Sequence, residues 1–321
     1  MPGRGIIMGH GWKQLTENSG AAIIGLVLIN VFWGASSIAS KEALLQLTAV
    51  EVVTVRFAIA FVAVLAIALA FAPGALRVRL RDLPALAFLS VAGVSLQFVL
   101  QVTALVYTTA TNFSLLFNLS AFFIMILGAV LLGERLGKNQ LAGAVVAFAG
   151  VFLIVGGSGI GLSAAHLPGD LIGLASAALF GVYTIAARRV SGRFGPMTIL
   201  VYTFFFGVLG LLPVYVLATP MTPLAGLNAV SWASLLFLAL CCSVIAFLVY
   251  NHGTARLRSA DVAMTIYVTP LAGVTLAVLL LGETLTAITL SGAALIMAGL
   301  YVSRERGPAG RAQATPEARD G

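Results

Sequence analysis

The segment LLGERLGKNQLAGAVVAFAG, residues 131–150, recurs as LLGETLTAITLSGAALIMAG at residues 280–299, which is 149 positions further along the chain. A second register, shifted by 147 residues, brings Trp33-Gly34 onto Phe180-Gly181 near the start of each copy. Self-similarity at a fixed spacing is the signature of a repeated structural unit. The chain is therefore expected to consist of two related halves.

Composition places both halves in a membrane. Hydrophobic residues make up 60% of the 321 residues and charged residues 9%, against about 25% charged in a soluble domain. A membrane helix needs about 20 apolar residues. Ten runs of this kind are expected at residues 21–44, 49–72, 83–107, 109–132, 138–157, 168–187, 197–218, 229–251, 260–281 and 286–303. The runs lack the alternation of barrel strands, so helices are predicted and a sizeable soluble catalytic domain is excluded.

Because each half holds five runs, the second half must enter the membrane upside down relative to the first. The expected fold is an all-α polytopic membrane protein of ten transmembrane helices in two inverted five-helix repeats. The expected parts are a cytoplasmic tail (1–20), the first repeat (21–157), a periplasmic linker (158–167), the second repeat (168–303) and a disordered cytoplasmic tail (304–321). Inverted repeats are typical of secondary carriers, with the site near the midplane. A duplication kept only for packing is the alternative.

The basic residues predict the orientation. Sixteen of the 18 Lys and Arg fall on one side of this arrangement, Lys41 falls on the other, and Arg56 lies within the second run. Cytoplasmic loops carry the excess of Lys and Arg, so both ends are expected in the cytoplasm. The basic residues are scattered over many loops, which argues against nucleic-acid binding. Residues 1–20 contain no apolar core of a signal peptide.

Polar residues in the middle of apolar runs are the candidates for a solute pathway, since such groups are costly in hydrocarbon. The substrate-binding candidates in these runs are Trp33, Ser37, Gln97, Gln101, Asn118, Tyr183, Tyr250 and Tyr267. Trp33 with Ser37, and Gln97 with Gln101, are four residues apart and share a helix face. The alternative for each residue is ordinary hydrogen bonding between membrane helices.

Arg56 is the only formal charge well inside a run. A lone membrane arginine is a functional-site hypothesis by default. Arg56 can bind a carboxylate of the solute, and it is therefore added to the substrate-binding candidates. Two other roles remain open, which are an ion pair with Glu42 or Glu51 and snorkelling to the outer interface.

The eleven Asp and Glu all lie at or beyond the ends of the runs. A pump built on a midplane carboxylate is therefore not supported, and neither is a metal-dependent prenyl transferase, which needs clustered Asp residues for its metal. The three histidines are too scattered for a zinc site. We expect no enzyme activity, no catalytic residue, no cofactor and no metal.

Runs five and ten carry small residues on one face, with Gly143, Ala147 and Gly150 in one and Gly292 and Gly299 in the other. Small residues allow close helix approach. The first expectation is that each face packs within its own half, and dimerisation through these faces is the alternative.

The order and the 5+5 spacing of four short motifs resemble the EamA-type family of the drug/metabolite transporter superfamily. The motifs are Trp33-Gly34, Arg56-Phe57, Tyr267-Val268-Thr269-Pro270 and the two Leu-Leu-Gly-Glu runs ending at Glu134 and Glu283. The resemblance covers about residues 20–303. It implies a ten-helix carrier of the bacterial inner membrane that exports amino acids, related metabolites or drugs, with a cavity lined by spans one, three, four, six, eight and nine. The family's proline in span four is replaced here by Ala121.

The leading hypothesis is a secondary transporter that exports small amphipathic metabolites, amino acids and in particular aromatic ones, by alternating access. A multidrug or nucleobase efflux carrier and a non-transporting membrane scaffold are the alternatives. The expected partners are a small-molecule substrate and membrane lipid, without nucleic acid, and a homodimer is left open. Neither the solute nor the coupling to protons follows from the sequence.

Overall fold

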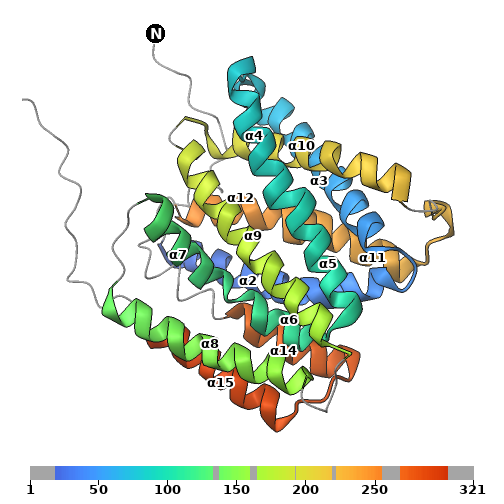
Figure 1. Ribbon diagram of the computed structural model, residues 1–321. Helices are drawn as coiled ribbons and strands as arrows, with labels where there is room; N and C mark the ends of the chain where they lie inside the picture. Colours follow the sequence, from blue (N-terminus) through green and yellow to red (C-terminus); the bar gives the residue numbers. More distant parts are fainter. Residues whose placement is uncertain are drawn as a thin grey trace, which may run out of the picture.

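The computed structural model describes residues 19–132, 137–159, 165–191, 193–218, 222–254 and 268–302. Every regular element in these ranges is a helix (Figure 1). Tyr267 belongs to the segment 255–267, which lies outside the described residues, as do residues 1–18 and 303–321.

The first half of the chain forms helices that match runs one to five. They are α2 (Ser19–Leu44), α3 (Ala49–Phe71), the short η1 (Pro73–Leu76) and η2 (Leu80–Asp82), α4 (Leu83–Ser90), η3 (Val91–Leu96), α5 (Gln97–Tyr107), α6 (Ala110–Phe117), α7 (Ser120–Leu132) and α8 (Lys138–Gly159). Helix α3 begins at Ala49 because Thr48 and Glu51 form a reciprocal capping box, with the Thr48 side chain accepting from the Glu51 N–H and the Glu51 carboxylate accepting from the Thr48 N–H.

The second half repeats this order. Its elements are α9 (Leu167–Ser191), α10 (Pro196–Ala218), η4 (Leu224–Gly226), α11 (Ala229–Leu236), η5 (Phe237–Ile245), α12 (Ala246–Thr254), α14 (Val268–Leu281) and α15 (Ala287–Val302). Shifted by 147 residues, the start of α3 at Ala49 falls on the start of α10 at Pro196. Helix α8 extends two residues into the expected linker, and residues 160–164 lie outside the described part.

Seven helical stretches among the described residues are long and apolar enough to cross a membrane, which makes the chain a multi-pass membrane protein. They run over Ile23–Leu44, Ala49–Phe71, Leu80–Tyr107, Ala110–Leu131, Leu167–Ala187, Pro196–Leu217 and Ala229–Tyr250. Shorter apolar helices, Leu141–Leu153, Val268–Leu281 and Ala287–Gly299, occupy runs five, nine and ten. The count of ten spans and the cytoplasmic location of both ends stay predictions.

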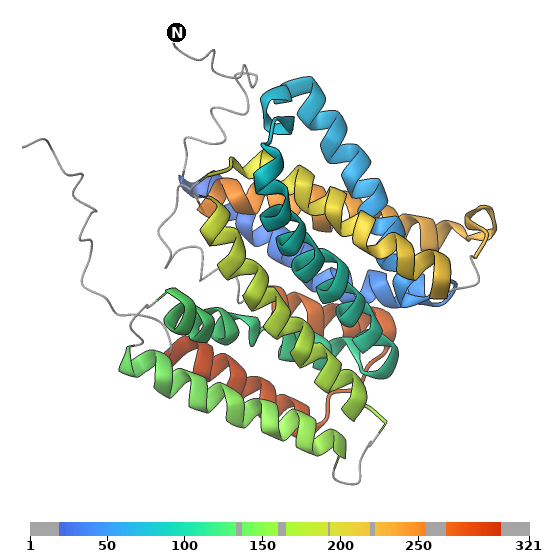
Figure 2. The same ribbon diagram turned by 45° about the horizontal axis from the view of Figure 1, so that its top comes forward.

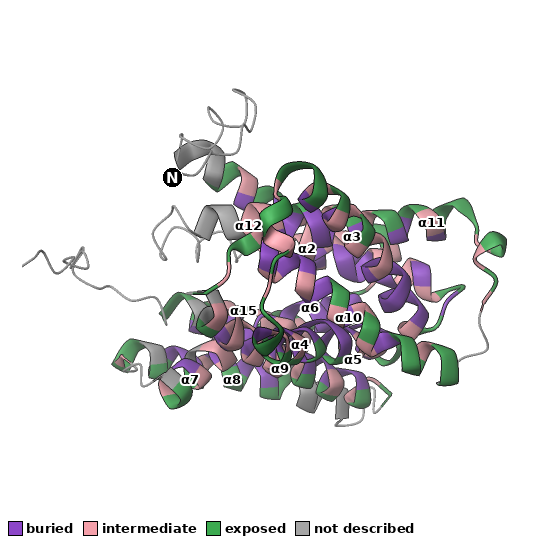
Figure 3. Ribbon diagram, turned by 90° about the horizontal axis from the view of Figure 1, so that it is seen from above, coloured by how far each residue is buried: buried purple, intermediate pink, exposed green. Residues whose placement is uncertain are grey.

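The burial of each residue depends on its position in the helix bundle. Buried residues gather where helices meet, while the outward faces are exposed (Figure 3). The outward faces include large apolar side chains such as Val130, Leu217 and Leu279, each more than two-thirds exposed. An exposed apolar surface of this kind suits lipid, in which it costs nothing to leave uncovered.

Two equivalent glycine contacts join the halves, one between α2 and α14 and the other between α9 and α7. A Cβ on Gly34 of α2 would lie 2.8 Å from the Cβ of Ala272 in α14. The equivalent Gly181 of α9 lies against α7, where an added Cβ would be 3.0 Å from the Cβ of Phe123. Phe123 and Ala272 are related by the 149-residue shift. The two contacts are therefore counterparts with the halves exchanged, as expected for two structurally equivalent repeats.

Helices α8 and α15 lie side by side along the lower edge of the bundle (Figures 1 and 2). A Cβ on Gly150 would be 2.6 Å from the carbonyl oxygen of Gly292, and a Cβ on Gly299 would be 2.5 Å from that of Gly143. The expectation that these faces pack within their own halves was wrong. The reason is that the two small-residue faces are complementary to each other, so fifth helices of opposite halves pair.

Polar bridges join the halves at the end of the bundle that the predicted topology places outside. The Glu283 carboxylate, just after α14, accepts hydrogen bonds from the N–H groups of Ala110 (2.8 Å) and Thr111 (3.0 Å) at the start of α6. Lys41 Nζ of α2 is 3.7 Å from Glu283 Oε1. The free N–H groups of a helix N-terminus favour a carboxylate at this position. Glu283 thereby ties spans one, four and nine together.

Candidate substrate-binding site

Two π-helical segments interrupt spans three and eight. They are η3 and η5, and the 149-residue shift places η3 at 240–245, inside η5. A π-helical turn is uncommon and often accompanies a functional site, because the extra residue changes the direction of the side chains that follow. Gln97 follows η3 directly, and Ser243 lies within η5. The sequence pattern did not predict either segment.

Trp33 of α2 packs on η5 and α12. Its Nε1 donates to the carbonyl oxygen of Cys242 at 3.0 Å. Its ring lies 6.0 Å from that of Phe247 and 5.5 Å from that of Tyr250, measured between centroids. The structure therefore brings two of the predicted residues, Trp33 and Tyr250, into one aromatic cluster between spans one and eight. Phe247 belongs to the same cluster and was missed, since a phenylalanine in an apolar run gives no signal.

Gln97 and Gln101 form a buried polar group between spans three and six. Gln97 Nε2 donates to Gln101 Oε1 at 3.0 Å and to Ser176 Oγ at 3.1 Å, and Ser176 Oγ donates to the Gln97 carbonyl oxygen at 3.2 Å. The Gln97 Oε1 atom is buried without a hydrogen-bond partner. A buried acceptor without a donor calls for an explanation, such as a bound water or ligand. Ser176 completes the group and was not among the predicted residues.

Arg56 lies in the middle of the helix bundle and is 1% exposed. Its Nε donates to Ser243 Oγ at 3.0 Å, and its guanidinium carbon lies 4.7 Å from the centre of the Phe98 ring and 5.2 Å from that of Phe57. Its Nη1 is buried without a partner. Cation–π contacts stabilise a guanidinium only partly, and no carboxylate of the described residues pairs with this buried positive charge.

Two alternative roles of Arg56 do not fit this placement. Snorkelling requires the guanidinium to reach the interface, whereas it is buried. No carboxylate among the described residues forms an ion pair with it. The Glu51 carboxylate instead accepts from the N–H groups of Thr48 and Thr222, at 2.7 Å each. Arg56 Nη1 is thus left without a hydrogen-bond partner among the described residues.

Ser37 and Asn118 line the contact between spans one, four and nine. Ser37 Oγ is 3.4 Å from Ser114 Oγ, and Asn118 Nδ2 donates to the Ser114 carbonyl oxygen at 2.6 Å. A Cβ on Gly273 of α14 would lie 2.5 Å from Ser114 Oγ. Ser37 is thus engaged in a contact between helices, which is the ordinary role weighed for it, whereas the Asn118 hydrogen bond lies within span four.

Asn118 also marks an interruption of span four, where α6 ends at Phe117 and α7 begins at Ser120. Discontinuous membrane helices are a common way to form a carrier's site. The interruption arises here without the proline that the resemblance led us to look for. The equivalent Pro270 lies in the first turn of α14.

Tyr183 lies over η3. A Cβ on Gly93 would overlap the Tyr183 ring, so glycine leaves the space that this ring occupies. Rings continue from Tyr183 toward the other end of the bundle through Phe180, Phe117 and Phe113, with successive centroids 6.0, 5.6 and 5.5 Å apart. The sequence pattern identified only Tyr183 of this row.

The described site residues therefore form separate groups on facing helices. Three groups are pairs: Trp33 with Tyr250, Gln97 with Gln101, and Ser37 with Asn118. The other two are Tyr183 of α9, which packs against η3, and Arg56 of α3, which donates to Ser243 of η5. Their elements belong to spans one to four, six and eight. Tyr267 lies outside the described residues. Their role in binding a substrate stays a prediction.

The fold and these groups define a polytopic membrane protein of two related helical halves with buried polar groups between them. Residues 20–156 and 167–304 each match the EamA-like transporter family. The two matches cover most of the chain, which therefore belongs to this family of transporters.

Proteins that are similar to this chain in sequence have names that describe transporters. The chain is 33% identical over 68% of its length to a protein named an uncharacterized transporter of Archaeoglobus fulgidus, covering 75% of that protein. It is 32% identical over 76% of its length to a probable terminal-alkyne amino-acid exporter of Streptantibioticus cattleyicolor, covering 81% of it. A probable amino-acid metabolite efflux pump of Salmonella typhimurium is 33% identical over 59% of this chain and 66% of the pump.

One solved crystal structure has the same fold. It superposes with a TM-score of 0.63 at 21% sequence identity, covering 88% of this chain and 96% of that one.

Proposed function

We propose that the protein is a secondary transporter that exports small amphipathic metabolites, amino acids first among them, across the inner membrane by alternating access. The transporter class comes from the family. The choice of amino acids is supported by one observation in this chain, which is the buried and incompletely paired guanidinium of Arg56.

An unpaired charge in a protein interior costs several kcal/mol. Arg56 carries such a charge and keeps Nη1 without a partner. An arginine binds a carboxylate with two parallel hydrogen bonds, which is the geometry that an amino acid offers. A bound carboxylate therefore offsets the cost of the buried charge. The same charge repels a cation, so a lipophilic cationic drug is the less suitable solute.

The remaining groups suit the rest of an amphipathic solute. The rings of Trp33, Tyr183 and Tyr250 offer an apolar wall, and Gln97, Gln101 and Asn118 offer amide groups. Two relatives carry names of amino-acid exporters or efflux pumps, which supports both the substrate class and the direction. The excess of basic residues on one predicted side supports a cytoplasmic location of both ends.

The test is flux through purified protein in liposomes, with labelled phenylalanine, leucine, threonine, adenine and a lipophilic cation, with and without a pH gradient. We expect saturable flux of at least one amino acid. Arg56→Gln should reduce it by about 30-fold, because a hydrogen bond to a charged group contributes about 2 kcal/mol.

Arg77→Gln is the matched control, since Arg77 is an exposed arginine. A comparison of the transported amino acid with its amide separates an effect on binding from an effect on folding. Wild type should prefer the acid to the amide, and Arg56→Gln should lose this preference. An unchanged preference would exclude Arg56 as the carboxylate ligand. Flux of the cation or adenine alone would favour the efflux alternative, and no flux from folded protein would favour a scaffold.

A further inference from the structure

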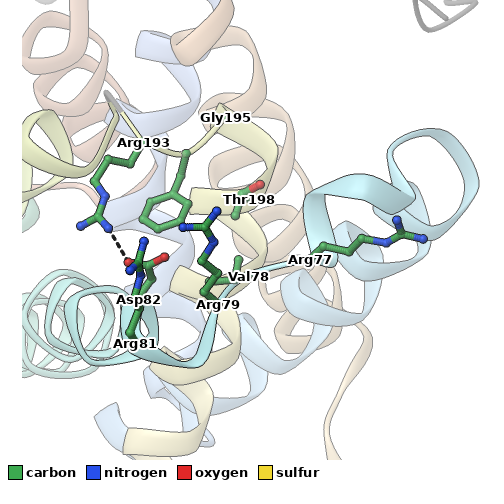
Figure 4. A pocket seen from close by; sticks show the side chains of 9 residues that line it. Arg77, Val78, Arg79, Arg81, Asp82, Arg193, Gly195 and Thr198 are labelled. Atoms are coloured by element: carbon green, nitrogen blue, oxygen red, sulfur yellow. Dashed lines mark hydrogen bonds and ion pairs between the residues drawn. The ribbon is translucent and has the colours of Figure 1, made fainter. Parts of the chain in front are cut away.

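A cavity of about 400 Å³ lies where the connection between spans two and three meets the start of α10 (Figure 4). The described residues that line it include Arg77, Arg79, Arg81 and Arg193, and Asp82 is the acidic residue among them. Arg193 Nη2 is 2.6 Å from Asp82 Oδ1. This pair is therefore balanced, and the other arginines form no ion pair with a described carboxylate.

The arginines differ in direction. Figure 4 shows Arg79 and Arg81 extending into the space beside the Arg193–Asp82 pair, while Arg77 extends away from it. Thr198, in the first turn of α10, also lines the cavity and is 9% exposed. The first N–H groups of a helix have no partner within the helix and favour negative charge. The cavity therefore combines a helix start and a hydroxyl with two guanidinium groups that form no ion pair among the described residues.

The equivalent junction in the first half of the chain, at the start of α3, contains a carboxylate. The 147-residue shift relates Thr198 of α10 to Glu51 of α3, at the same position after each helix start. Glu51 is fully buried and accepts from the N–H of Thr222 at 2.7 Å, in the connection between spans seven and eight. A carboxylate of the chain thus joins that helix start to the neighbouring connection.

At the cavity the carboxylate is replaced by Thr198, and the neighbouring connection carries arginines instead. We infer that this cavity binds a phosphate group, which takes the place that the Glu51 carboxylate has in the other half. Several guanidinium groups match the oxygens of a phosphate. The predicted topology puts the cavity at the cytoplasmic interface, where the phosphate can belong to an anionic lipid headgroup or to a soluble phosphate.

The first test measures lipid retained by purified protein in native mass spectrometry, with phosphatidylglycerol and phosphatidylcholine as probes. Wild type should retain phosphatidylglycerol selectively. The double variant Arg79→Gln, Arg81→Gln should bind it about 30-fold more weakly, because each interfacial arginine contributes about 1 kcal/mol. Arg77→Gln removes the same kind of charge at the edge of the cavity, where the side chain extends away from the Arg193–Asp82 pair, and should change little. Equal losses in Arg77→Gln and the double variant would reduce the effect to general charge and overturn the inference.

Inorganic phosphate distinguishes the two sources. If millimolar phosphate displaces phosphatidylglycerol from wild type and raises its melting temperature, the cavity accepts soluble phosphate. If it does neither while lipid remains bound, the ligand is the lipid headgroup. Binding of neither probe would refute the inference.

Thr198→Glu gives a test that does not remove an arginine. This substitution gives α10 the glutamate that α3 has at the equivalent position. It should abolish selective retention of phosphatidylglycerol and any stabilisation by phosphate. The melting temperature should not fall. Retention equal to wild type in this variant would contradict the proposed position of the phosphate.

Discussion

At the scale of single residues, Gln101 distinguishes a binding role from a structural one. Its Oε1 accepts from Gln97 Nε2 inside a group that includes Ser176. Gln101→Leu removes this acceptor and leaves the Gln97 amide with Ser176. We expect at least a tenfold loss of flux, while the melting temperature falls by only a few degrees for a cost of about 1 kcal/mol.

Ser176→Ala is the companion variant, because it removes a hydrogen bond of the same group but not a predicted binding residue. Flux and thermal unfolding are measured on the same preparations. Wild-type flux in Gln101→Leu would assign this residue to helix packing alone.

At the scale of elements, the apolar runs predicted most helices within a few residues, since membrane helices require long apolar stretches. The interruptions within spans were not predicted. Val91–Leu96 and Phe237–Ile245 are apolar like their surroundings, so nothing in their composition indicates a π-helical turn. The break at Asn118 was equally hidden, since it lacks a proline.

The same limit applies to the site. Polarity identified Trp33, Gln97 and Arg56 as candidates, because polar groups in apolar runs stand out. It did not indicate that Ser176 and Phe247 would join them, as such contacts depend on how the spans pack. The pairing of α8 with α15 could not be read from either face alone.

Segment η3 depends on Gly93. Gly93→Ala places a methyl group where the Tyr183 ring lies, so the ring must move away from η3. We expect a several-fold loss of flux and a change in near-ultraviolet circular dichroism from the displaced tyrosine. Gly74→Ala, with no atom within 4 Å of the new methyl group, should change neither. Equal spectra and flux for the two variants would show that the Tyr183 position is not required.

The α8–α15 pair predicts a loss of stability. Gly150→Ala places a methyl group 2.6 Å from the backbone oxygen of Gly292, and backbone cannot rotate away as a side chain can. The helices must separate, which costs about 1–3 kcal/mol. Thermal unfolding in detergent measures this cost, with Gly226→Ala as a control in open space. A melting temperature as high as that of the control would contradict the tight contact.

At the scale of the whole molecule, Glu283 holds three spans together at the predicted outer end. Glu283→Gln keeps the shape but removes the charge that pairs with Lys41 and with the start of α6. Spans one, four and nine should then separate more easily at the predicted outer end. We expect faster reaction of an impermeant thiol reagent, added from outside, with Ser37→Cys in a protein lacking Cys241 and Cys242.

Glu42→Gln provides the matched control, because Glu42 lies in the same outer part of α2 and forms no ion pair with a described residue. The rate should increase several-fold in Glu283→Gln and stay near the starting value in Glu42→Gln. A rate that Glu283→Gln leaves unchanged would mean that this carboxylate does not hold the outer end closed.

The pairing of α8 with α15 also bears on how the chain is made. During synthesis α8 ends at residue 159, yet its partner is the last described helix, Ala287–Val302, which is made much later. Until then the glycine face of α8 stays uncovered, and quality control can recognise it. A nascent chain that stops before α15 is therefore left with an unfinished first half as well as a missing helix, so its degradation should begin with residues made long before the point of arrest.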